Sequence, residues 1–79
     1  MARIRSLTQS ASQSKVHPTE VDAEWALIDA GGQRLFQLST FGSDERMSLP
    51  KVSQTIQLDR ATAKELMSAV TLVFPDLGV

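Results

Sequence analysis

The side chains of this chain that could do chemistry are mainly cations and neutral hydrogen-bonding groups. Eight of them are candidates for contacts with a nucleic acid: Arg3, Arg5, Arg34, Arg46, Lys51, Ser53, Thr55 and Gln57. Guanidinium and ammonium groups bind phosphate oxygens, and hydroxyl and amide groups exchange hydrogen bonds with base edges. Nucleic-acid binding, with DNA preferred, is therefore the first functional hypothesis.

Catalysis is not expected from this inventory. General acid–base, nucleophilic and zinc chemistry need His, Cys or paired carboxylates in a rigid setting. The chain has no Cys, and its one His, His17, lies in a polar segment. The pair Gly31-Gly32 lacks the wider spacing of a dinucleotide fingerprint. We expect no enzyme, no catalytic residues, no metal, no cofactor and no small-molecule substrate.

Residues 52–58 predict the strand that would carry three of the polar candidates. Aliphatic and polar side chains alternate there with the period of a half-buried strand, and only Gln54 interrupts the pattern. The aliphatic face is made of Val52, Ile56 and Leu58. The opposite face, with Ser53, Thr55 and Gln57, is either a set of base-reading groups or the solvated side that such a strand needs in any case.

A helix is predicted directly after this strand, because the apolar period changes at Asp59. One stripe contains Ala63, Leu66, Met67, Val70 and Phe74. The Asp59 carboxylate suits the helix start, where it accepts from free amides and meets the positive end of the dipole. Pro75 ends the pattern at about Phe74. We assign Leu66, Met67, Val70 and Phe74 to a core or dimer contact.

A β-hairpin is predicted for residues 24–41. Its arms are 24–29 and 34–41, and Gly31-Gly32 supplies the positive φ angles of a tight turn. Each arm has an apolar face, which carries Trp25 on the first arm and Phe36 on the second.

Three aromatic residues, Trp25, Phe36 and Phe41, are candidates for stacking on bases. Packing in a core or dimer contact is the plainer alternative, since large aromatic side chains dominate the buried area of small domains.

The chain divides into a flexible basic arm, residues 1–20, and a domain over 21–79. Residues 1–16 carry three cations and no acid, whereas residues 17–79 carry five cations and all nine acids. A basic arm on a mildly acidic body suits contact with phosphates, and a solubilising disordered tail is the alternative.

A chain of 79 residues buries a modest core and often needs help from a partner, a metal or a disulfide. Without Cys, and with His only in the arm, self-association is the remaining source of stability. We predict an α+β homodimer in which a small antiparallel sheet, a hairpin plus a third strand, is followed by one amphipathic C-terminal helix. No apolar run is long enough for a membrane span, so a cytoplasmic protein without membrane contact is expected.

The stretches GGQRLFQLSTF, SLPKVSQTIQLD and RATAKELMSAV resemble, in order and spacing, the positive cofactor four family of single-stranded-DNA-binding transcriptional coactivators. The resemblance covers about residues 24–74. It implies a homodimer of curved sheets backed by helices. It also implies nucleic-acid contacts from Arg34, Arg46 and Lys51 and from one of the three aromatic candidates. The family is more basic in this loop, whereas here Asp44 and Glu45 precede Arg46.

The segment 52–70 also resembles the strand and first helix of a ribbon-helix-helix repressor. That resemblance implies paired strands whose outward side chains read the major groove of duplex DNA. Only five residues follow Phe74, which leaves no room for the second helix of that fold. A third hypothesis is a protein interaction module that uses an open sheet edge or the arm.

Overall fold

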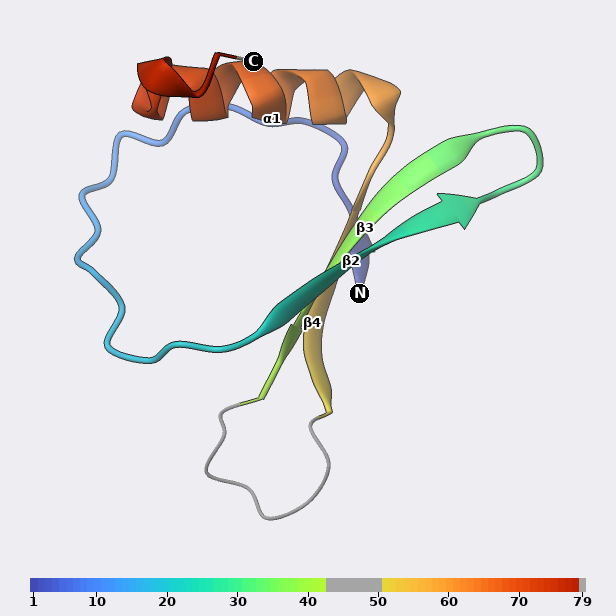
Figure 1. The fold of residues 1–79 in the computed structure, drawn as a ribbon, viewed down its shortest axis with the longest axis horizontal. Coiled ribbons are helices and arrows are strands. Elements are labelled where there is room, and N and C mark those ends of the chain that lie inside the picture. The colour runs from blue at the N-terminus through green and yellow to red at the C-terminus, as the bar shows by residue number, and fades with distance from the viewer. Residues whose placement is uncertain (43–50, 79) are drawn as a thin grey trace.

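A computed structural model describes residues 1–42 and 51–78 of the chain. Its elements are β1 (Ala2–Arg3), β2 (Ala23–Asp29), β3 (Arg34–Phe41), β4 (Val52–Leu58), α1 (Arg60–Val73) and a 3-10 turn, η1 (Pro75–Leu77). The strands form one mixed sheet in the order β1-β4-β3-β2, and α1 runs from the end of β4 past the sheet (Figure 1). The predicted α+β class and C-terminal helix are confirmed. The predicted antiparallel hairpin and third strand are present as β2, β3 and β4, but the whole sheet is mixed, because a fourth strand, β1, pairs with β4 in parallel.

The hairpin forms where the sequence predicts it. Strands β2 and β3 pair in antiparallel register from Ala23 opposite Thr40 to Asp29 opposite Arg34. The turn closes through the Ala30 amide, which donates to the Gln33 carbonyl at 2.7 Å. Both glycines of the turn have positive φ, 60° at Gly31 and 91° at Gly32. A side chain with a Cβ is strained in that conformation, which explains the glycine pair.

Strand β4 has the predicted bounds, but its alternation does not extend to Val52. Thr40 pairs with Gln54, whereas its neighbour Phe41 pairs with Val52, so one extra residue lies on β4 at this point. Such a β-bulge shifts the side-chain pattern by one position. Val52 is consequently displaced from the face of Ile56 and Leu58 and is largely exposed. The expectation that Val52 shares their face is therefore wrong.

Helix α1 begins and ends close to the predicted positions. The Asp59 side chain caps it, accepting at Oδ1 from the Thr62 amide and the Thr62 hydroxyl, each at 2.9 Å. The helix ends at Val73, and Phe74 is its C-cap. Pro75 then opens η1, which the sequence analysis did not predict. Proline suits the first position of a helical turn because that amide has no partner within the turn.

Replacement of Asp59 by Asn should lower stability most at neutral pH. Hydrogen bonds from the Thr62 backbone amide and hydroxyl, and the charge of Arg3, lower the pKa of Asp59 against the opposing effect of desolvation. A carboxylate with a lowered folded-state pKa stabilises the fold above its unfolded pKa, and this contribution is lost as the pH falls through the folded value. Thermal melts should therefore separate Asp59→Asn from the unaltered chain at pH 7 and converge with it in acid. Glu65→Gln, an exposed helix carboxylate, is the control, and a constant gap between Asp59→Asn and the unaltered chain at all pH values would contradict this account.

The single chain has a very small core. Leu35 and Leu58 are its only buried hydrophobic side chains among the described residues, at 5% and 1% exposure. The accessible surface is 7308 Å², whereas a compact monomer of 8.6 kDa is expected to expose about 4700 Å². The radius of gyration is 14.8 Å, against about 11.6 Å for a compact domain of this length. The extended arm, residues 4–22, contains no helix or strand and is almost entirely exposed, so it contributes to both excesses.

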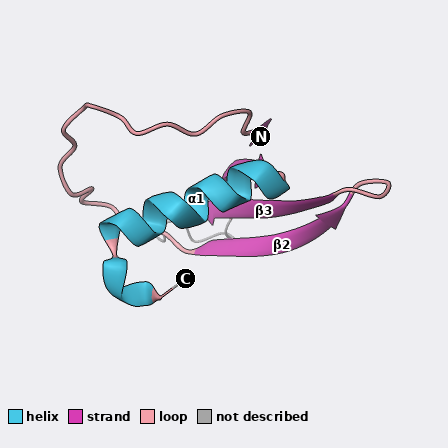
Figure 2. Cartoon of the chain, turned by 90° about the horizontal axis from the view of Figure 1, so that it is seen from above, coloured by secondary structure: helices cyan, strands magenta, loops and turns pink. Residues whose placement is uncertain are grey.

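The arm follows the helix before it joins the sheet. Residues 4–22 contain no helix or strand, and in Figure 2 α1 lies between the arm and the β2–β3 hairpin. A groove between arm and helix is lined by Leu7, Thr8, Gln9, Glu65, Leu66, Ala69, Leu72 and Val73. Flexibility of the arm stays a prediction. None of the helices in the described part of the chain has the length and apolar character needed to cross a membrane.

Candidate nucleic-acid interface

The strand register sorts the side chains of the sheet onto two faces. Residues directly opposite one another on paired strands point to the same side. Trp25 lies opposite Leu38, which lies opposite Ile56, and the next row is Leu27, Phe36 and Leu58. The apolar face therefore consists of Trp25, Leu27, Phe36, Leu38, Ile56 and Leu58.

The polar face lies on the other side of the same strands. Arg3 lies opposite Gln57, and Gln57 lies opposite Gln37. The adjacent row is Glu24, Ser39 and Thr55. The polar side chains of this face are Arg3, Gln37, Gln57, Glu24, Ser39 and Thr55, and the same face also carries Ala26, Ile28 and Leu35 towards the hairpin turn.

The row of Arg3, Gln57 and Gln37 is the part of the polar face best suited to bind a ligand. Gln57 Nε2 donates to Gln37 Oε1 at 2.8 Å, which fixes the two amides relative to each other. Both glutamines are half-buried, and Arg3 is exposed beside them. Each amide has two N–H donors and one carbonyl acceptor, so a single mutual bond leaves further donors and acceptors for a ligand. The row presents one cation and two oriented amides along one line.

Thr55 is buried in the sheet, although the sequence predicted an accessible hydroxyl that could read bases. It is only 8% exposed, and its Oγ1 shares a hydrogen bond of 3.1 Å with Ser39 Oγ, which is equally buried. A buried hydroxyl in a side-chain pair stabilises the sheet and is not accessible to a base edge. Thr55 is therefore a structural residue, and the expectation that it reads bases is wrong.

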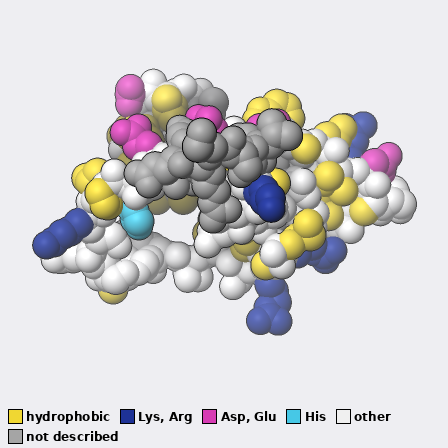
Figure 3. Space-filling view, turned by 90° about the horizontal axis from the view of Figure 1, so that it is seen from below, with side chains coloured by type: hydrophobic (Ala, Val, Ile, Leu, Met, Phe, Trp, Pro, Cys, Tyr) yellow, Lys and Arg dark blue, Asp and Glu magenta, His cyan; other side chains and the backbone are white. Residues whose placement is uncertain are grey.

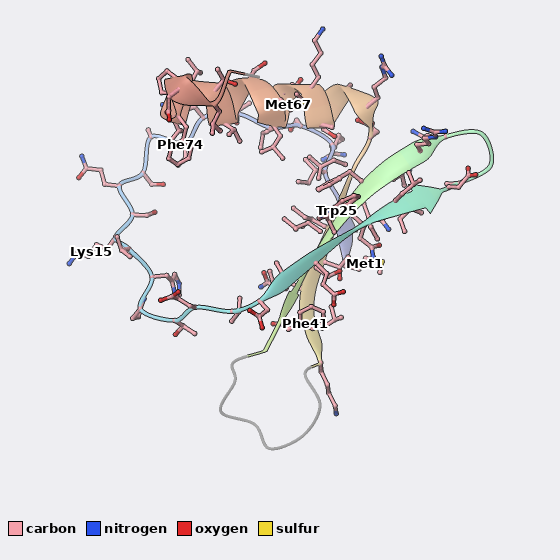
Figure 4. The ribbon with its side chains drawn as sticks, in the orientation of Figure 1. Met1, Lys15, Trp25, Phe41, Met67 and Phe74 are labelled. Carbon is pink, nitrogen blue, oxygen red and sulfur yellow. The ribbon has the colours of Figure 1, made fainter. Side chains whose placement is uncertain are left out.

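Two further polar candidates lie at the far end of β4. Lys51 and Ser53 are exposed, and the Lys51 carbonyl accepts from the Gly42 amide at 3.0 Å. About six residues of strand, roughly 20 Å, separate Lys51 from Gln57. Phe41 lies opposite Val52 at this end and is half-buried (Figure 4). Arg5 is exposed in the arm, and Arg46 falls outside the described residues.

Two of the three stacking candidates are on the opposite face from Gln57. The rings of Trp25 and Phe36 stack with centroids 6.0 Å apart and planes at 16°. They line an open pocket of about 250 Å³ together with Arg34, Leu58, Ala63 and other residues. Trp25 is 70% exposed although it belongs to the apolar face. The structure thus brings Trp25, Phe36 and Arg34 together, but separates them from Arg3 and Gln57.

The residues assigned to a core or dimer contact form a stripe along α1 that is only partly buried. Met67 and Phe74 are more than half exposed, whereas Leu66 and Val70 are half-buried. Hydrophobic side chains also reach the surface elsewhere, as the view in Figure 3 shows. The stripe therefore contributes little to the core of the single chain.

Three further residues of these surfaces, Gln37, Ser39 and Arg60, were not predicted from the sequence. Gln37 and Ser39 alternate with the apolar residues of β3, so period two alone was a sufficient signal for their face. Arg60, the first helical residue, lines the Trp25–Phe36 pocket because β4 ends beside it. Its place beside an aromatic cluster from other strands has no local sequence signal.

The described residues hold no group of three or more His, Asp or Glu side chains that could bind a metal ion. Comparison with protein-family models, curated proteins and solved structures gives no significant match to this chain.

Proposed function

We propose that this chain is a homodimeric nucleic-acid-binding protein that binds single-stranded DNA on the polar face of its sheet, with a role in transcription regulation or DNA handling. The supporting observation is the row of Arg3, Gln57 and Gln37, in which a cation lies beside two mutually oriented amides. Lys51 adds a second cation at the other end of β4. Arg3 and Lys51 would bind phosphates, and the glutamine amides would hydrogen-bond to base edges.

Single strands fit this surface better than a duplex. Unpaired bases can turn their edges toward the amides, whereas a duplex offers its edges only within a groove. A ribbon-helix-helix protein inserts a free pair of strands into that groove. Here β4 lies between β1 and β3, and only the short turn η1 follows α1 within the described residues. This arrangement supports the choice of single-stranded DNA over duplex DNA in the proposal.

The small number of cations determines the affinity and the salt dependence that we expect for DNA binding. Each phosphate contact made by a basic side chain contributes about −0.7 to the slope of log affinity against log salt for a single strand. With Arg3 and Lys51 as the two main contacts per chain, the slope should be shallow and the affinity modest. Strong binding at physiological salt is not part of this proposal.

Lys51→Glu and Arg3→Gln should weaken binding to a labelled single-stranded oligonucleotide, measured by fluorescence anisotropy at low salt. Loss of one phosphate contact should reduce the salt slope by about 0.7 per chain. The matched control is Lys15→Glu, which changes the net charge as Lys51→Glu does but lies in the arm, far from the strands of the sheet (Figure 4). The unfolding midpoints of the variants should remain near that of the unaltered chain.

Three outcomes would count against the proposal. One is no binding at low salt, and another is equal loss of binding in Lys15→Glu and Lys51→Glu, which would indicate a diffuse charge effect. The third is better competition by duplex than by single-stranded oligonucleotides.

One observation favours a second candidate function, a protein interaction module. Strand β2 forms one edge of the sheet, and an open edge can accept a strand from another protein. A partner that is captured from cell extract equally well after nuclease treatment, by a chain that fails to bind oligonucleotides, would favour this alternative.

A further inference from the structure

The Trp25–Phe36 pocket combines an aromatic wall with two cations. It lies where β3 begins and β4 ends, because Phe36 pairs with Leu58 in antiparallel register. Arg34 is the first residue of β3 and Arg60 is the first residue of α1, and both line the pocket. The edge strand β2 contributes Trp25. Three segments that are distant in sequence thus bring rings and guanidinium groups together at one end of the sheet.

The lining of this pocket has an excess of positive charge. In the described part of the chain it contains two cations, Arg34 and Arg60, and one acid, Asp59. The Asp59 Oδ1 already accepts from the Thr62 amide and hydroxyl, each at 2.9 Å. Asp29 lies opposite Arg34 in the hairpin, but within residues 1–42 and 51–78 no ion pair holds either guanidinium. Both arginines are exposed. Since a guanidinium binds a carboxylate through two parallel hydrogen bonds, their chemistry favours an anionic ligand.

The aromatic wall favours a flat ligand. The centroids of the Trp25 and Phe36 rings are 6.0 Å apart, whereas a third ring between them would need about 7 Å, twice the contact distance of carbon atoms. A ligand ring therefore stacks on an outer surface, and Trp25, which is 70% exposed, offers one. The pocket volume is about 250 Å³, and cavities of about 150 Å³ hold benzene. One or two fused rings with an acidic group fit this space, whereas a long aliphatic chain would extend out of it and gain no stacking.

We propose that the Trp25–Phe36 pocket binds a small aromatic carboxylate, whose ring stacks on Trp25 and whose carboxylate is held by Arg34 and Arg60. The ring wall belongs to the apolar face, so the ligand leaves the polar face with Gln57 free. This inference goes beyond the proposed function and requires neither nucleic-acid binding nor a second copy. A ligand that is bound without reaction is compatible with the sequence-based expectation of no small-molecule substrate.

Titration of the full chain with 2-naphthoate tests the proposal. Trp25 is the only tryptophan, so its indole N–H gives a single side-chain signal in the NMR spectrum of isotope-labelled protein. This signal should shift and saturate, with a dissociation constant of roughly 20 µM to 1 mM for a ligand of this size. The matched control ligand is 2-naphthamide, which has the same rings without the charge. It should bind about 10-fold more weakly, because it lacks the charge-assisted hydrogen bonds.

Substitution of the two arginines tests how the carboxylate is held. Arg34→Gln and Arg60→Gln should each raise the dissociation constant of 2-naphthoate by about 10-fold and leave that of 2-naphthamide nearly unchanged. The control is Lys64→Gln, which removes a charge from the same turn of α1 outside the pocket lining and should bind like the unaltered chain. All three side chains are exposed, so the thermal midpoints of the variants should stay close together.

Four results would overturn the inference. The first is a Trp25 signal that does not move with 2-naphthoate, and the second is equal affinity for 2-naphthoate and 2-naphthamide. The third is displacement of 2-naphthoate by a single-stranded oligonucleotide, which would assign the pocket to nucleic acid. The fourth is a Trp25 signal that shifts with protein concentration alone, which would assign the pocket to a second copy. Binding of 2-naphthoate by a chain that binds no oligonucleotide would refute the proposed nucleic-acid function and leave this site standing.

Discussion

Leu58→Ala is expected to cost about 2–5 kcal/mol of stability, the range for truncation of a fully buried leucine. Leu58 is 1% exposed, and Leu35 is the only other buried hydrophobic side chain in the described part of the chain. Leu58 also joins β4 to α1 through Asp59 and lines the Trp25–Phe36 pocket, so its loss weakens sheet, helix and pocket together. A chain of this length is expected to have about 4–12 kcal/mol in total. The variant should therefore be partly or wholly unfolded.

Urea denaturation followed by circular dichroism measures this effect. Protein concentration must be the same for all samples, because the stability of a dimer depends on it. Leu72→Ala is the matched control, since it makes the same chemical change at an exposed position and should alter stability by about 0.5 kcal/mol or less. Equal destabilisation by the two substitutions would show that Leu58 is not the centre of the core.

Thr55→Val should be the second most damaging substitution, at about 1–3 kcal/mol. Valine has nearly the shape of threonine, so the change removes the hydroxyl and leaves the volume. The Ser39 hydroxyl then loses its partner at 3.1 Å while only 8% exposed. An unsatisfied buried hydroxyl costs its full desolvation free energy.

A double-mutant cycle separates this pair from simple packing effects. Ser39→Ala combined with Thr55→Val removes both hydroxyls, so it should be less damaging than the sum of the single substitutions. Oligonucleotide binding by folded Thr55→Val should match that of the unaltered chain. Additive free energies, or loss of binding without loss of stability, would return Thr55 to the list of base-reading residues.

The local elements of the fold could be predicted because each has a short-range cause. The glycine pair sets the hairpin turn, the Asp59 carboxylate sets the helix start, and the change of apolar period at Asp59 separates strand from helix. Two features depend on pairing between distant residues. The parallel strand Ala2–Arg3 requires β4 as its template, and the bulge at Val52 depends on the register with Phe41. The apolar residues Ile4 and Leu7 indicate that the arm could pair with a sheet edge, but the residues that pair, Ala2 and Arg3, and the position of the bulge have no pattern within their own segments.

The candidate site was predicted only in part, for a related reason. Residue type identified Arg3, Gln57 and Trp25 as possible contacts, but type does not state which face of a sheet each occupies. The register places Trp25 with Ile56 and places Gln57 with Gln37. This separation removes the aromatic pair, Trp25 and Phe36, from the face that carries Gln57. Phe41 is the one stacking candidate left near the polar candidates of β4.

The proposed function depends on a two-chain assembly that leaves the polar face of the sheet free for DNA. Sedimentation of the unaltered chain at micromolar concentration, alone and with an unlabelled single-stranded oligonucleotide, tests this directly. The account predicts a folded species of twice the 8.6 kDa chain mass that gains the mass of the oligonucleotide at low salt and still contains two chains. A folded species with the mass of one chain, or a dimer that separates when the oligonucleotide binds, would contradict it.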